Sequence, residues 1–97
     1  MKTRNFVHRG LKRLYEEDDK AKGVPPETVD KLRKILAYLD DMESSEELRS
    51  LTVWKAHTLT GDRKGVWSLS ATRNRRLTFH IDATENEICD LNLEDYH

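Results

Sequence analysis

Cysteine, proline and long apolar runs are scarce in this chain of 97 residues, which has one cysteine, two prolines and four glycines. The single cysteine, Cys89, has no partner for an internal disulfide or a paired metal site, which agrees with a reducing compartment, and we expect it to be a small core residue. The longest apolar runs are only a few residues, far short of a membrane span, and the first ten residues lack the apolar stretch of a signal peptide. These absences predict a cytoplasmic protein, and the length of 97 residues predicts one domain over residues 1–97.

The formal net charge of −1 conceals a strong segregation of charge along the chain. Residues 1–15 carry five basic and no acidic side chains, and residues 49–81 carry seven basic and one acidic. Residues 16–48 carry eleven acidic and five basic side chains, and residues 82–97 carry six acidic and none basic. Because exposed charges are screened beyond about 8–10 Å, the local charge of a surface matters more for the choice of partner than the net charge does. The charge pattern alone is equally consistent with a basic face that binds nucleic acid and with a surface of mixed charge that has no such role.

The first half of the chain predicts a short strand followed by two helices. The segment "TRNFVH" favours a strand, and "RGLKRLYEED" places its apolar residues at helical spacing. Gly23, Pro25 and Pro26 then end this helix, and a proline suits the first turn of the next one. Apolar side chains recur at steps of three and four from Val29 to Leu39 and predict a second helix of about four turns, with Asp40 on its outer side. The acidic segment 40–51 is expected to be a connection with a short helical turn near residues 46–50.

From Val53 onward the apolar period changes from helical to two. The segments "VWKAHTL", "VWSLS", "RRLTFHI" and residues 87–93 read as strands, separated by "GDRKG", "ATRN" and "DATEN" as turns. Helices that precede a run of strands indicate an α+β fold, with the two helices packed on the apolar face of an antiparallel sheet. The opposite face is then polar and solvated; its predicted members are Ser68, Ser70, Arg76, Thr78, His80, Asp90 and Asn92.

Several residue types near this polar face are those that RNA cleavage without a metal requires. Arg76 lies within a strand beside Arg73 and Arg75, and the guanidinium fork is suited to a phosphate group. His8 and His80 are interpreted as ordinary surface or core histidines, whereas His57 and His97 are candidates for proton transfer. Together with the phenol of Tyr96 and the carboxylate of Asp95, they fit a reaction in which the 2′-hydroxyl of RNA attacks the adjacent phosphorus. The spacing of His57, His80, Cys89 and His97 matches no recognised metal site, so neither a metal nor another cofactor is expected.

Four segments, "LKRLYEE", "HTLTGDRKGVWSLS", "RNRRLTF" and "DLNLEDYH", resemble in order and spacing the HigB-like toxins of the RelE/ParE superfamily. The resemblance covers nearly the whole chain and implies a RelE-like fold. It also implies the toxin of a type II toxin–antitoxin system, a ribosome-dependent endoribonuclease that cuts messenger RNA and inhibits translation without a metal. The implied partners are the ribosome, mRNA and a HigA-like helix-turn-helix antitoxin, with operator DNA contacted only through the antitoxin.

Carried over residue by residue, the resemblance assigns catalysis to His57, Asp95, Tyr96 and His97. Substrate or phosphate binding falls to Arg76, with Arg63, Lys64, Arg73 and Arg75 as further cations. Which of the catalytic residues is the acid and which is the base stays open. Two other functions also stay open: a non-catalytic member of the superfamily that docks a protein such as DNA gyrase, and a plain RNA-binding domain.

Overall fold

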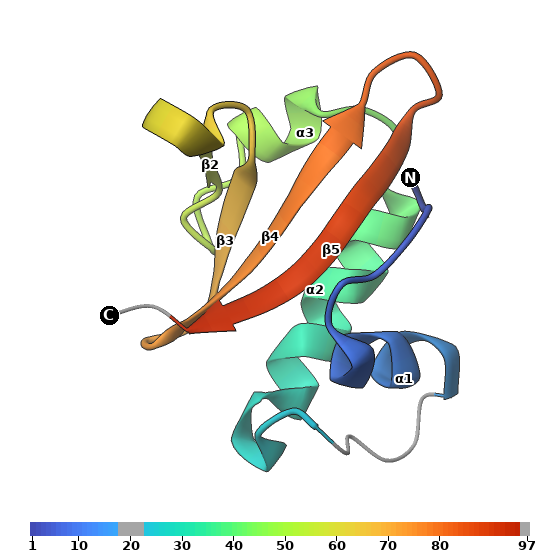
Figure 1. The fold of residues 1–97 in the computed structure, drawn as a ribbon, viewed down its shortest axis with the longest axis vertical. Helices are drawn as coiled ribbons and strands as arrows, with labels where there is room; N and C mark the ends of the chain where they lie inside the picture. Colours follow the sequence, from blue (N-terminus) through green and yellow to red (C-terminus); the bar gives the residue numbers. More distant parts are fainter. Residues whose placement is uncertain (18–22, 96–97) are drawn as a thin grey trace.

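A computed structural model of the protein, in which residues 1–17 and 23–95 are described, shows an α+β fold. Figure 1 shows α2 passing behind the sheet, with α1 beside its lower end and α3 near the upper end of the strands. No helix within the described residues combines the length and apolarity that crossing a membrane requires. The elements in chain order are β1 (Lys2–Thr3), α1 (Arg9–Glu17), η1 (Pro26–Thr28), α2 (Val29–Asp41), α3 (Glu46–Arg49), β2 (His57–Thr58), η2 (Gly61–Arg63), β3 (Trp67–Thr72), β4 (Arg75–Asp82) and β5 (Glu87–Asp95).

The sheet has five strands in the order β1-β5-β4-β3-β2. Strands β2 to β5 form the predicted antiparallel meander, and β1 adds to the opposite edge in parallel with β5. The predicted α+β class, with its N-terminal strand, helices and antiparallel sheet, is therefore confirmed, with one parallel strand added. The added strand brings the N-terminus beside β5, as the blue and red ribbons of Figure 1 show.

The core lies between α2 and one face of the sheet. Leu32, Ile35 and Leu39 of α2 are completely or almost completely buried, as are Leu77 and Phe79 of β4. Their spacing of three and four on the helix, and of two on the strand, directs each set to the shared interface. This packing sends the alternate strand residues to the outer face of the sheet, which is the face that α2 does not cover.

Two of the predicted strands are shorter in the structure. The segment 53–59 contributes only His57–Thr58, because Lys55 has a left-handed backbone with φ of 52° and its N–H bonds Thr52 O at 3.1 Å in a turn. The strand expected over residues 3–8 is limited to Lys2–Thr3, followed by an isolated bridge between Phe6 and Leu91.

The prediction that Cys89 is a core residue is wrong, since its side chain is half-buried. A register shift between Thr78 and His80 in the β4–β5 ladder places Cys89 directly opposite His80. Residues directly opposite each other share one face of a sheet. Cys89 therefore lies with the exposed His80 and away from the helices.

The start of α1 depends on a histidine. The N–H of Leu11 donates to Nδ1 of His8 at 3.1 Å, which satisfies one of the backbone donors that a helix N-terminus leaves unpaired. Accepting this bond requires an unprotonated Nδ1. Burial, followed by the nearby charge of Arg75, lowers the pKa of His8 below its ordinary value and so favours the neutral imidazole.

Candidate active site

A hollow of about 310 Å³ on the outer face of the sheet brings together four of the predicted site residues, His57, Arg63, Arg76 and Asp95. They come from β2, η2, β4 and the end of β5, so the hollow is assembled across most of the sheet. Its remaining lining residues are Leu59, Ser68, Thr78 and Glu94.

The pairing register of the strands explains this convergence. His57 lies opposite Ser68, which lies opposite Thr78, so these three residues form one row across β2, β3 and β4. In the neighbouring row, Arg76 lies opposite Glu94. Because residues two apart on a strand share a face, both rows project to the same side of the sheet, away from α2.

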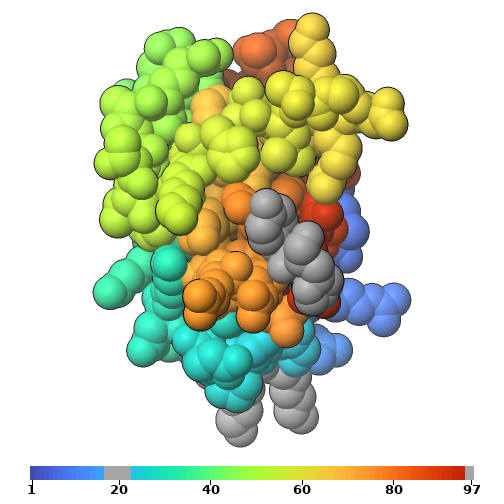
Figure 2. All heavy atoms as spheres, turned by 90° about the vertical axis from the view of Figure 1, so that its left-hand side faces the viewer, coloured from blue at the N-terminus to red at the C-terminus, as the bar shows by residue number. Residues whose placement is uncertain are grey.

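The outer face was predicted to be solvated, and for the centre of this face the prediction is wrong. Ser68 is fully buried and Thr78 is only 4% exposed. The chain after β2 turns back at η2, and the N–H of Leu59 bonds Val66 O at 2.8 Å to close the loop. Figure 2, which looks onto the β2 edge of the sheet, shows residues of this part of the sequence (yellow-green to yellow) across the upper centre and right of the view, above the β3–β4 turn (orange). The loop packs beside this part of the face, where Ser68 and Thr78 are buried, while His57 and Arg63 at the hollow stay exposed.

Arg76 is oriented at the floor of the hollow by a neighbouring strand. Its side chain is half-buried, and Nη1 donates to Oγ of Ser68 at 3.3 Å. A guanidinium held in this way presents a planar set of donors that matches the oxygens of a phosphate group. The structure thus gives the predicted phosphate-binding arginine a defined orientation.

His57 is held in the tautomer that a general base requires. Its Nδ1 lies 2.7 Å from the backbone oxygen of Lys55. A carbonyl oxygen only accepts hydrogen bonds, so Nδ1 must carry the proton, and the neutral ring then has its lone pair on Nε2. The left-handed backbone of Lys55, which turns the chain just before β2, accompanies this contact.

Glu94 is a central member of the hollow that the sequence reading did not select. Arg63 donates from Nη1 to Oε1 at 2.9 Å and from Nη2 to Oε2 at 2.5 Å, and the hydroxyl of Thr78 also donates to Oε2. The bond from Arg63, and then that from Thr78, lowers the pKa of Glu94 below its ordinary value. The alternation of Asn92 and Glu94 on β5 was a signal that could have placed it on the outer face.

The other predicted cations are distributed around the hollow. Arg75 forms an ion pair with Asp95, which fixes the carboxylate at the end of β5. Arg73 is exposed in the β3–β4 turn, and Lys64 lines a second, adjacent hollow. The predicted residues Tyr96 and His97 lie outside the described residues. Within the described residues, no group of three or more His, Cys, Asp or Glu side chains is arranged to hold a metal ion.

Comparison with known families identifies the chain. The model for the RelE-like toxin HigB of type II toxin–antitoxin systems matches residues 4–97. The chain belongs to the family of HigB-like toxins. It is 38% identical over 94 residues to the endoribonuclease HigB of Proteus vulgaris, a match that covers 97% of this chain and 98% of the relative.

Solved structures confirm the RelE-like fold of this HigB-like toxin. The YoeB/ParE toxin from Agrobacterium tumefaciens has a TM-score of 0.57 at 16% identity, over 100% of this chain and 99% of that one. The RelBE2 toxin–antitoxin complex from Mycobacterium tuberculosis has a TM-score of 0.52 at 20% identity, over 99% and 98% of the two chains. The YoeB–YefM complex from Staphylococcus aureus has a TM-score of 0.54 at 17% identity, over 96% and 93%. The family predicted from the sequence is confirmed by the family model and by the relative from Proteus vulgaris, and an alternative role as a protein-docking module is not favoured.

Proposed function

We propose that this HigB-like toxin is an endoribonuclease that cleaves messenger RNA on the ribosome by attack of the RNA's own 2′-hydroxyl, without a metal ion. One observation carries the proposal. The same hollow is lined by His57, Arg76 and Asp95, the residue that precedes the predicted Tyr96 and His97. In this hollow His57 has Nε2 as its acceptor, and the guanidinium of Arg76 is oriented by Ser68. The name of the relative from Proteus vulgaris, an endoribonuclease, supports the same activity.

In this proposal Arg76 binds the scissile phosphate. Charge builds up on the phosphate oxygens when the 2′-oxygen attacks, and donors that are already aimed at those oxygens stabilise the transition state without reorganising. Arg63, Lys64, Arg73 and Arg75 supply further positive charge around the hollow and attract the RNA backbone.

His57 is assigned to proton abstraction. Nε2 takes the proton of the 2′-hydroxyl, the 2′-oxygen forms a bond to phosphorus, and the bond from phosphorus to the 5′-oxygen breaks. An acid then protonates the departing 5′-oxygen, so the products are a 2′,3′-cyclic phosphate and a 5′-hydroxyl. We assign the acid role to His97, because an imidazole titrates near working pH.

The end of the chain completes the site in the proposal. Asp95 is fixed by its ion pair with Arg75, and we assign it to orienting the residues that follow. Tyr96 is assigned to stacking on a base, as aromatic side chains do in single-stranded RNA recognition.

The biological setting of the proposal follows from the family. The toxin would be a single domain over residues 1–97 that acts in the cytoplasm, and a cognate antitoxin would hold it inactive. A HigA-like helix-turn-helix antitoxin is proposed, with operator DNA contacted only through that protein. The solved RelBE2 and YoeB–YefM structures are complexes of related toxins with antitoxins, which supports a partner of this kind.

Induction of the toxin in a bacterium that lacks the antitoxin tests the proposal. Wild type and His97→Ala are expressed at equal levels, and 5′ ends of messenger RNA are mapped across the transcriptome. We expect growth arrest and new ends inside reading frames for the wild type, both lost in the variant. Equal arrest by both proteins, or arrest without new ends, would reject the proposed function.

A further inference from the structure

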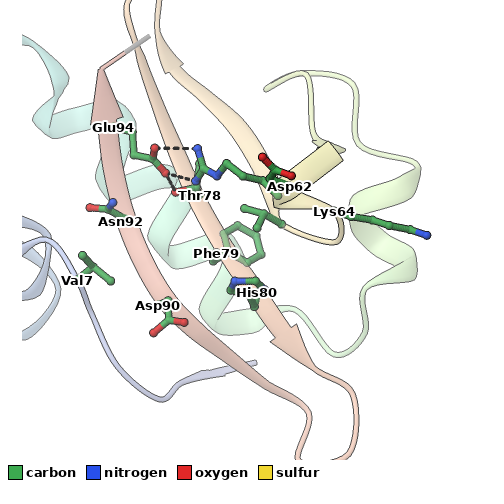
Figure 3. A pocket seen from close by; sticks show the side chains of 11 residues that line it. Val7, Asp62, Lys64, Thr78, Phe79, His80, Asp90, Asn92 and Glu94 are labelled. Atoms are coloured by element: carbon green, nitrogen blue, oxygen red, sulfur yellow. Dashed lines mark hydrogen bonds and ion pairs between the residues drawn. The ribbon is translucent and has the colours of Figure 1, made fainter. Parts of the chain in front are cut away.

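A second hollow, of about 400 Å³, adjoins the candidate active site on the outer face of the sheet. Arg63, Thr78 and Glu94 line both hollows, so the ion pair between Arg63 and Glu94 forms the wall between them. Figure 3 shows Glu94 and Thr78 at one end of this second hollow, with His80 and Asp90 toward the other. Its volume falls in the range that small-molecule sites in proteins occupy.

The two hollows follow one another along the direction of β4. Arg76 lies in the first, Thr78 in the shared wall and His80 in the second, and they are successive outward-facing positions of this strand. Because a strand rises about 3.3 Å per residue, each step between these positions is roughly 7 Å. An extended RNA strand that enters the first hollow and follows β4 would therefore reach the second.

The charges of the second hollow favour a base over a phosphate. Asp62, Asp90 and Glu94 contribute carboxylates, and Figure 3 shows the side chain of Lys64 extending away from the hollow. Carboxylate and amide oxygens accept hydrogen bonds from the exocyclic amino groups of bases, whereas carboxylates repel phosphate. Arg63 lies between the two hollows, where its guanidinium donates to both carboxylate oxygens of Glu94. A phosphate offers the same pair of acceptor oxygens and can take the place of this carboxylate.

The carboxylate of Asp90 is held in place before any ligand arrives. Nδ2 of Asn5 donates to Oδ1 of Asp90 at 2.8 Å, and the N–H of Asp90 donates to Oδ1 of Asn5 at 3.0 Å. Asp90 has a left-handed backbone with φ of 55°, which breaks the alternation of β5 next to the register shift of the β4–β5 ladder. Two reciprocal bonds across the N-terminal segment therefore fix an acceptor that needs little ordering on binding.

We propose that the second hollow binds the base of the nucleotide next to the cleaved linkage and selects bases with an exocyclic amino group. Asp90 and Asn92 accept from the amino group, His80 borders the base, and Arg63 leaves Glu94 to hold the intervening phosphate. This inference rests on the proposed endoribonuclease function and adds a site for substrate selection to it. Uracil, which has no amino group, is the base that this hollow discriminates against.

Titration of isotope-labelled toxin with dinucleotides tests the inference by NMR. In one series the first nucleotide is 2′-deoxyadenosine and the second carries adenine, cytosine, guanine or uracil. In the other series the first nucleotide carries the varied base and the second is adenosine. The first nucleotide is a 2′-deoxynucleotide in both series, because its 2′-hydroxyl would be the nucleophile for cleavage. In at least one series, we expect shifts at the amides of His80, Asp90 and Asn92 together with those near Arg76. The dissociation constant for uracil should be about fivefold or more above the others, the scale expected for one base contact.

Two variants provide matched controls. Asp90→Asn keeps the size of the side chain and suits a left-handed backbone, but the new amide both donates and accepts hydrogen bonds. The discrimination against uracil should therefore disappear in this variant, while the NMR shifts near Arg76 persist. Asn92→Ala, at a position that faces the same hollow, should weaken the amino bases alone. Shifts confined to the first hollow, absence of shifts at His80, Asp90 and Asn92, or equal affinities for all four bases would overturn the inference. Loss of cleavage in Arg76→Ala is measured separately, so failure of the selection site and failure of the endoribonuclease function are distinguishable.

Discussion

Substitution of Arg76 is the most informative change at the proposed phosphate site. In the structure Arg76 is half-buried, lines the hollow and donates to Ser68, so its guanidinium has a defined orientation. A hydrogen bond to a charged group contributes about 1.5–3 kcal/mol. Because the site is partly open to water, the lower value applies, and two bonds to a phosphate amount to about 3 kcal/mol, or roughly 100-fold in rate at about 1.4 kcal/mol per factor of ten.

We therefore expect Arg76→Ala to lower kcat/KM for cleavage by about 100-fold. Arg76→Lys keeps the charge but loses the planar fork, and about a tenfold loss is expected. The assay is cleavage of a labelled messenger RNA on programmed ribosomes under single-turnover conditions. Thermal unfolding followed by circular dichroism checks that both variants are folded.

Ser68→Ala is the matched control for orientation. It removes one acceptor of Arg76, the Oγ of Ser68, without touching the charge, so a loss of a few-fold in kcat/KM is expected, smaller than that of Arg76→Lys. Retention by Arg76→Ala of cleavage within threefold of wild type would refute the reasoning, because the guanidinium of Arg76 would then contribute little to binding the reacting phosphate.

Three further predictions concern a proton, a pH dependence and a close backbone contact. His57→Ala removes the proposed base, so the cleavage rate should fall by about 10²–10⁴-fold, and an unchanged rate and pH profile would remove His57 from the chemistry. Because the pKa of His8 is lowered in the fold, its neutral form stabilises the protein at high pH, and this contribution is lost as pH falls below about 6.5. The free energy of unfolding of wild type and His8→Ala is measured with urea between pH 8 and 5, and the difference between the two proteins should shrink at acid pH. A difference that stays constant would contradict the capping role. A Cβ at Gly10 would lie 2.8 Å from the backbone carbonyl carbon of Gly23. Gly10→Ala should therefore destabilise the fold by about 1–3 kcal/mol, although alanine has a better helix propensity than glycine. A raised Tm would contradict this prediction and show that the segments containing Gly10 and Gly23 separate easily.

The parts of the fold that depend on local pattern could be predicted from the sequence. The three- and four-residue spacing of Leu32, Ile35 and Leu39 predicts α2 and its buried face, and the alternation of Leu77 and Phe79 predicts β4 and its core side. The same alternation places Arg76 on the outer face, where the structure finds it. These features rest on periodicity, which a single sequence displays directly.

The parts that depend on contacts between distant residues could not be predicted in this way. Glu94 acquires its role from Arg63, 31 residues earlier in the chain, and no local pattern indicates that pair. The burial of Ser68 follows from the loop after β2, which turns at Gly61 and Gly65, both with positive φ. The glycines signal a turn, but the direction in which it folds is set by the sheet that it covers.

The most direct test of the central claim is cleavage of messenger RNA that carries a single 2′-deoxy nucleotide. Ribosomes are programmed with a transcript whose cleavage position has been mapped, and the 2′-hydroxyl is removed at that position or, as a control, two nucleotides away. The account predicts that the first substitution abolishes cleavage there, that the second leaves it intact, and that the product of the control ends in a 2′,3′-cyclic phosphate. Cleavage at the mapped position without its 2′-hydroxyl would contradict the account, because the nucleophile would then not be the RNA itself.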